Sequence, residues 1–151
     1  MYIILYSAKR AAGATWLDKL ISFVERVPYS HAEQLLEVWD NKTTAGVYGC
    51  HAARGGVSFG LVDLREYDVW YCPTAPGSME RFLGMVGRPY SYWSVLRTKL
   101  PWLPKIGRGV NCAHTIAEVL GMRDADTAGM KDLLDYIEAH GYRVDINLKR
   151  I

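Results

Sequence analysis

The sequence lacks several features that would place it in a restricted class. Its three cysteines cannot pair completely and none lies in a CxxC spacing, so a disulfide framework and a structural zinc site are not expected. No stretch reaches the ~18–20 apolar residues of a membrane span. The apolar run at the N-terminus precedes Lys9 and Arg10, which is the reverse of the order in a signal peptide. We therefore expect a protein that is soluble in the cytoplasm where it is made.

The chain also has little charge imbalance, because its formal net charge is only +2. A net charge this small does not indicate a polyanionic partner, and the sequence contains no nucleic-acid-binding motif. No nucleic-acid partner is therefore expected. Half of the 151 residues are hydrophobic and 23% are charged, which is the composition of a globular protein. Without repeats, linkers or low-complexity stretches, the sequence predicts one domain over residues 1–151.

Hydrophobic periodicity predicts an α+β fold with a small antiparallel sheet. Apolar runs and alternating patterns favour strands at residues 2–6, 31–38, 46–51, 57–62, 68–72 and 143–148. Asp40-Asn41-Lys42-Thr43 is typical of a hairpin turn. Helical spacing and capping residues favour a helix that begins after Thr15 and ends before Pro28, and further helices at 79–86, 91–98, 112–120 and 128–140.

Cys112 is the strongest candidate for a reactive group. Asn111 is a good N-cap residue, which places Cys112 in the first turn of a helix, where the helix dipole and free N–H groups favour a thiolate. No Asp or Glu occurs between residues 81 and 117, whereas this segment holds a set of basic residues that would favour the thiolate further. The basic residues are Arg81, Arg88, Arg97, Lys99, Lys105 and Arg108.

A nucleophilic thiolate needs a base, and the four histidines differ in suitability. His114 is two positions from Cys112 and would point away from it on a helix, while His140 suits the C-terminus of the last helix. His31 and His51 are expected on neighbouring antiparallel strands, where they can meet. A set of Cys112, His31 and His51 would supply a nucleophile, a base and a residue that orients the base.

Four segments in this order carry a resemblance to a known family. They are Tyr29-Ser30-His31-Ala32-Glu33, Ala53-Arg54-Gly55-Gly56-Val57, Gly87-Arg88-Pro89-Tyr90-Ser91-Tyr92, and Asn111-Cys112 followed by Glu118-Val119-Leu120-Gly121. Over residues 2–121 the chain resembles the circularly permuted branch of the NlpC superfamily of papain-like cysteine peptidases and amidases. Relatives in that branch include YiiX-like bacterial proteins, lecithin–retinol acyltransferase-like enzymes and phage proteins. In this branch the histidine strand precedes the cysteine helix, as it does here.

The resemblance implies a permuted papain-like fold, in which a small antiparallel sheet packs against a helix that carries the nucleophile. It implies Cys112 as nucleophile and His31 as general base, and it places the third catalytic residue in the strand that ends at His51. We predict His51 for that role, with Glu33, on the same strand face as His31, as the alternative. The chain departs from relatives that have serine after the cysteine, because Ala113 stands there.

The implied function is a cysteine hydrolase of the peptidase or amidase type that acts through an acyl-thioester on an amide- or ester-bearing substrate. A cationic rim around Cys112 would favour carboxylate-bearing substrates and hence peptidoglycan peptides. No cofactor and no metal are implied. Two alternatives stay open: a catalytically silent binding or structural protein, such as a phage-encoded, virion-associated component, and a lipid acyltransferase or thioesterase. Residues 96–108 interleave apolar and basic side chains, which suits a membrane interface, but we favour a loop packed on the core.

Overall fold

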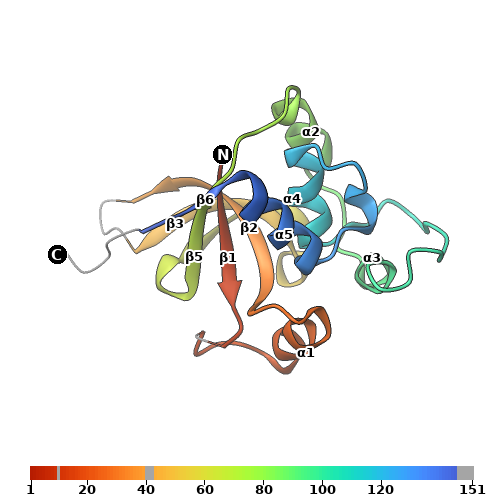
Figure 1. Ribbon diagram of the computed structural model, residues 1–151, viewed down its shortest axis with the longest axis horizontal. Coiled ribbons are helices and arrows are strands. Elements are labelled where there is room, and N and C mark those ends of the chain that lie inside the picture. Colours follow the sequence, from red (N-terminus) through yellow and green to blue (C-terminus); the bar gives the residue numbers. More distant parts are fainter. Residues whose placement is uncertain (10, 40–42, 146–151) are drawn as a thin grey trace.

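The computed structural model describes residues 1–9, 11–39 and 43–145. It shows an α+β arrangement with a six-stranded sheet in the order β4-β3-β2-β1-β5-β6, in which all neighbouring strands are antiparallel. The strands are β1 (Tyr2–Ser7), β2 (Tyr29–Val38), β3 (Thr44–His51), β4 (Gly56–Asp63), β5 (Tyr67–Tyr71) and β6 (Tyr142–Val144). β1 and β2 occupy the centre of the sheet (Figure 1).

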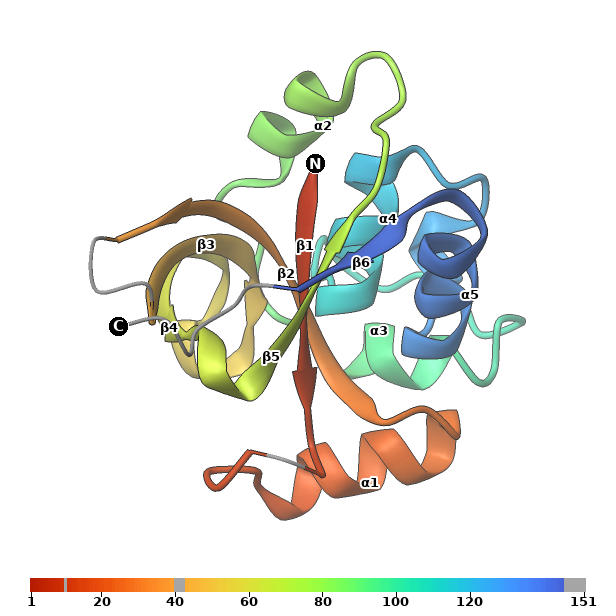
Figure 2. The same cartoon turned by 60° about the vertical axis from the view of Figure 1, so that its left-hand side comes forward.

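Five α-helices complete the described part of the chain: α1 (Trp16–Glu25), α2 (Ser78–Met85), α3 (Tyr92–Arg97), α4 (Cys112–Leu120) and α5 (Met130–His140). Three short 3-10 turns connect elements: η1 (Ala52–Arg54), η2 (Leu64–Glu66) and η3 (Ala125–Thr127). Figure 2 shows α3, α4 and α5 on one side of the sheet, α1 at one end of it and α2 at the opposite end. None of the described helices is long and apolar enough to cross a membrane.

Local sequence signals explain where α1 and α4 begin. Thr15 and Asp18 form a reciprocal capping box at the start of α1, which satisfies N–H groups that have no partner inside the helix. Asn111 Oδ1 accepts a hydrogen bond of 2.8 Å from the backbone N–H of His114, and this bond fixes the start of α4 at Cys112. Gly121, in the left-handed region at φ 77°, ends the same helix.

The central strand β2 separates two apolar layers because successive side chains point to opposite faces. Ala32 packs with Ile3 and Leu5 of β1 against α4 and α5, so this face carries the helices. The opposite face buries Ile4 and Val47 in a second apolar cluster. The sheet itself encloses this cluster, because β3 and β4 curl away from the helices (Figure 2).

The structure confirms the α+β class and the expected strands and helices, with differences at their ends. α3 is shorter than the predicted helix over 91–98, and α5 begins at Met130 rather than at 128 because η3 precedes it and Gly129 is its N-cap. The last strand ends at Val144, and the remainder of the strand predicted to 148 extends into residues outside the described part. Residues 40–42 of the predicted hairpin turn also lie outside the described residues.

Candidate active site

A cavity of about 550 Å³ opens between α1, the start of β2, the end of β3 and the segment before α3. Cys112, His31 and His51 all line it, so the structure brings the three residues predicted from the sequence into one place. The other lining residues are Tyr6, Gly13, Thr15, Leu17, Asp18, Ile21, Ser30, Ala52, Ala53, Tyr67, Tyr90 and Tyr92.

Cys112 is the first residue of α4 and is buried, with 7% of its surface exposed. Burial alone would raise the pKa of its thiol, but the positive charge of His31 and a hydrogen bond from its ring lower it. Backbone N–H groups of Ala32 and Ala113 add hydrogen bonds that also favour the thiolate. The net effect is a lowered pKa, as expected for a thiol at a helix N-terminus with a basic partner.

The other two cysteines differ from Cys112 in both surroundings and acidity. Cys50 packs in the cluster around Tyr48 and Val57, and its Sγ donates to the carbonyl oxygen of Val110 at 3.3 Å. Burial and the neighbouring Cys112 raise the pKa of Cys50 to about 12. Burial also raises the pKa of Cys72. Only Cys112 among the three has surroundings that favour the thiolate, and all three thiols are free.

His31 has a carboxylate beside it from its own strand. Its Nε2 lies 3.5 Å from Oε2 of Glu33, whose side chain is completely buried. Residues two apart on one strand usually point in parallel without touching, but this pair lies within ion-pair distance. The reason is Gly49 on β3: a Cβ atom there would lie 2.8 Å from Cγ of Glu33, so the missing side chain gives the carboxylate room to lean.

His51 contacts His31 in a different way. The two rings meet edge to face, with centroids 4.8 Å apart and planes at 82°. Nδ1 of His51 accepts a hydrogen bond of 3.1 Å from the backbone N–H of Ala53, which leaves the ring proton on Nε2 in the neutral form. Burial and the charge of His31 lower the pKa of His51, so the neutral form is favoured. The orienting role predicted for His51 stays a prediction, and the 3.5 Å distance favours Glu33.

Arg54 extends the set of charged groups beneath the cavity, and no role for its side chain was predicted from the sequence. Its guanidinium reaches from η1 to Oε1 of the buried Glu33. Gly60 of β4 leaves the space that the Arg54 guanidinium occupies, because a Cβ atom at position 60 would collide with it. The only signal in the sequence was the presence of glycine at 49 and 60 within strands, where glycine often marks a close approach of another group.

The charge around the cavity differs from the sequence-based expectation. Among the described residues, its lining contains no Lys or Arg, and Asp18 is the one carboxylate. Burial would raise the pKa of Asp18, but hydrogen bonds from Thr15 and Ser30 hold it below its usual value, so the side chain stays ionised. The expected cationic rim is therefore not part of this cavity.

The basic residues of the acid-free segment are used elsewhere. Arg81 donates to the carbonyl oxygens of Glu118 and Val119 at the end of α4. Arg97 pairs with Asp126, and Lys99 pairs with Glu25. The remaining three line a separate cavity of about 450 Å³; they are Arg88, Lys105 and Arg108.

The remaining histidines lie away from the cavity, as predicted. Burial and the charge of Lys105 lower the pKa of His114 to about 4, so its ring is neutral. His140, at the end of α5, stacks on Tyr136 and bonds its carbonyl oxygen at 2.8 Å. In the described part of the chain, no group of three or more His, Cys, Asp or Glu side chains is placed to bind a metal ion.

Comparisons with protein-family models, with curated proteins and with solved structures find no match.

Proposed function

We propose that this protein is a cysteine hydrolase, in which Cys112 attacks an amide or ester carbonyl and forms an acyl-thioester. The observation that carries the proposal is that Cys112, at the N-terminus of α4, and His31 line the same cavity, where the charge of His31 favours the thiolate. A buried cysteine without a catalytic role would have a raised pKa, as Cys50 and Cys72 have.

In the proposed reaction His31 takes the proton of Cys112, and the thiolate forms a bond to the carbonyl carbon. The oxyanion is stabilised by backbone N–H groups at the start of α4, whose dipole favours negative charge there. When the tetrahedral intermediate collapses, His31 passes its proton to the leaving amine or alcohol. Water then attacks the thioester with His31 as base, which releases the acid and restores the thiol.

Glu33 is the group that we propose orients His31. It stands on the Nε2 side of the ring, and its negative charge favours the imidazolium that forms during the reaction. Arg54 contacts the other carboxylate oxygen and fixes the side chain in place. His51 packs against the edge of the ring and limits its rotation. His51→Ala should then retain part of the activity, whereas Glu33→Gln should lose more.

The permuted papain-like fold of the NlpC type is part of this proposal. An antiparallel sheet with the base on a central strand, and a helix that packs on this sheet and begins at the nucleophile, support it. Peptidoglycan peptides stay a proposed substrate class. The cavity lining favours these peptides for a different reason from the carboxylate binding expected from the sequence. Asp18 and four tyrosines suit a protonated amine near the scissile bond rather than a carboxylate.

The experiment is acylation by p-nitrophenyl acetate followed by mass spectrometry. The wild type should release p-nitrophenol in a burst and gain one acetyl group, located on the peptide that contains Cys112. Cys112→Ser and His31→Ala should lose the burst, and Cys50→Ser is the matched control that should keep it. A wild type that is folded but shows no acetylation of Cys112 would favour the silent binding or structural protein. Faster acyl transfer to added alcohols than to water would favour the acyltransferase.

A further inference from the structure

Helix α1 exposes a stripe of large apolar side chains that none of the residues in the described part of the chain covers. Trp16 and Phe23 are 75% and 80% exposed, and Leu20 and Val24 lie on the same face because the four positions follow helical spacing. The inner face of the helix is already occupied: Leu17 and Ile21 line the active-site cavity. Soluble proteins seldom expose such a stripe unless it has a partner.

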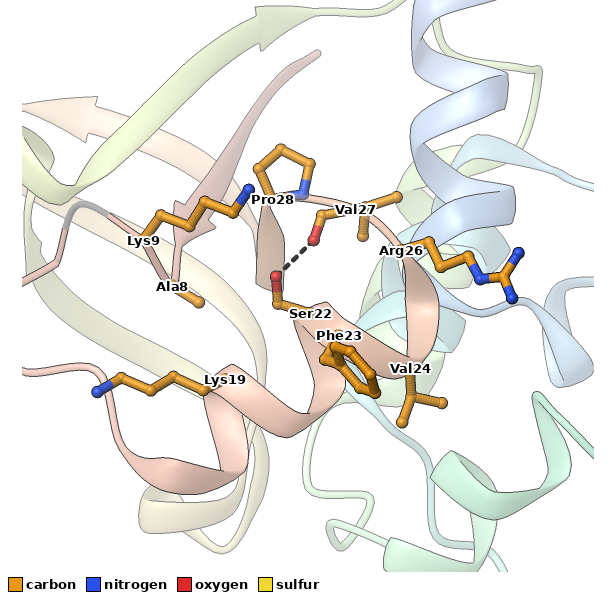
Figure 3. Close-up of a pocket in the computed structure, with 9 residues that line it drawn as sticks. All are labelled: Ala8, Lys9, Lys19, Ser22, Phe23, Val24, Arg26, Val27 and Pro28. Carbon is orange, nitrogen blue, oxygen red and sulfur yellow. Dashed lines mark hydrogen bonds between the residues drawn. The ribbon is translucent and has the colours of Figure 1, made fainter.

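Cations surround this stripe. Lys9, Lys19 and Arg26 line a groove of about 850 Å³ together with Phe23 and Val24 (Figure 3). A hydrogen bond of 2.5 Å from Ser22 Oγ to the carbonyl oxygen of Val27 joins the helix to the strand that follows it and fixes the floor of the groove. The groove is therefore an apolar surface with positive charge on both sides.

The carboxylates of α1 are turned away from this surface. Asp18 bonds Thr15 and Ser30 on the cavity side. Glu25 is buried and pairs with Lys99. The exposed face of α1 thus combines apolar side chains with cations, and no described carboxylate of the helix offsets their charge.

The backbone conformation of Arg26 is a second indication that the positive charge beside the groove has a role. It adopts the left-handed conformation at φ 56° after the last turn of α1, a position where glycine is usual because any Cβ atom is strained there. The chain nevertheless has an exposed arginine at this position, and in Figure 3 its guanidinium extends away from Lys9 and Lys19 at the other end of the groove.

We propose that this face of α1 docks on an anionic lipid bilayer. An apolar helix face with Trp, Phe and Leu, flanked by Lys and Arg, is the pattern of helices that lie in the plane of the membrane interface. A second copy of the chain fits less well, because a two-fold contact would bring the same three cations of each copy together. The inference concerns binding and does not depend on the proposed chemistry of Cys112.

The test is co-sedimentation of the full chain with large vesicles. Vesicles that contain phosphatidylglycerol should bind the protein, and vesicles of phosphatidylcholine alone should bind it much more weakly. Added salt should reverse the binding to the anionic vesicles, since exposed charges are screened. Lys19→Gln should weaken binding about fivefold, as expected for one cation near an anionic surface. Phe23→Ser should weaken it about tenfold or more, because an aromatic side chain no longer enters the interface.

Two control variants are matched in chemistry but lie elsewhere. Leu83→Ser removes an exposed apolar side chain from α2, at the opposite end of the molecule (Figure 1), and Arg123→Gln removes an exposed cation beyond α4. Both should bind vesicles as the wild type does. Circular dichroism melting should show that Phe23→Ser is folded, which its high exposure leads us to expect.

Three results would overturn the proposal. The first is no binding to anionic vesicles, or equal binding to neutral ones. The second is an equal loss of binding in Leu83→Ser and Phe23→Ser. The third is a dimer in light scattering that becomes a monomer in Phe23→Ser, which would assign the surface to a second copy of the chain.

Discussion

Removal of the His31 ring should change the acidity of Cys112 more than any other single substitution. His31 supplies both a positive charge and a hydrogen bond to the thiolate, and burial acts against them. In His31→Ala, burial would be opposed only by the backbone N–H groups of Ala32 and Ala113. The pKa of Cys112 should therefore rise.

The size of the effect follows from the kind of interaction lost. A hydrogen bond to a charged group contributes about 1.5–3 kcal/mol, which corresponds to about a 10- to 150-fold change in the thiolate fraction at a pH below the pKa. Iodoacetamide reacts with the thiolate, so its rate at mildly acidic pH should fall by the same factor in His31→Ala.

The assay is the rate of carbamidomethylation at Cys112, followed by peptide mass spectrometry over a range of pH. Cys50 and Cys72 serve as internal references in the same sample, because burial raises the pKa of both. Cys112→Ser should lack the fast phase completely. An unchanged rate–pH profile in His31→Ala would refute the argument that His31 controls the thiol, and a fast phase at Cys50 or Cys72 would show that the wrong cysteine had been chosen.

Three further predictions concern the parts that hold the site. Arg54→Met should lower the free energy of unfolding by about 3 kcal/mol in urea titrations, since it leaves the fully buried carboxylate of Glu33 without this partner. Glu33→Gln should cost less, because the Arg54 side chain is 23% exposed, and the double variant should recover part of the summed loss. Additive losses in the double variant would contradict that pairing. Asp18→Asn should cost about 1 kcal/mol at neutral pH. The pKa of Asp18 is lowered in the folded state, so its contribution to stability is complete above the ordinary carboxyl pKa of about 4. That contribution is lost as the pH falls through the lowered pKa, and the melting curves of wild type and Asp18→Asn should therefore converge in acid. A difference in melting temperature that stays constant with pH would contradict this prediction. Gly56→Ala should cost about 2–4 kcal/mol, because Gly56 is at φ 150° and its new Cβ atom would meet the carbonyl oxygen of Arg88. Its matched control is Gly84→Ala in α2, where nothing lies within 4 Å of the new atom and a small gain in stability is expected.

The elements with strong local signals were predictable from the sequence. Thr15 and Asn111 are N-cap residues in the sequence and in the structure, and the start of α4 at Cys112 followed directly from this. The proximity of His31 and His51 also followed, because period-two alternation and an antiparallel hairpin place the two residues near each other.

The charged groups behind His31 were not predictable in the same way. Glu33 and Arg54 meet because β3 and β4 curl and because glycines at 49 and 60 leave space above the strands. Both conditions depend on sheet curvature and register between distant segments, which hydrophobic periodicity does not report. The missing cationic rim has a similar cause: the basic residues after position 80 pair with carbonyls and carboxylates that are far away in the sequence.

The order of His31 and Cys112 along the chain has a consequence for how the proposed site forms. Strands β1 to β5, which include His31, are synthesised before α4, and each strand after β1 pairs with a neighbour that is already present. Cys112 gains its partner only when Ile116 and Leu120 of α4 pack against Ile3 and Leu5. A nascent or partly unfolded chain therefore carries an ordinary thiol. Reactivity at Cys112 in mild acid would then report that the last helices have folded onto the sheet.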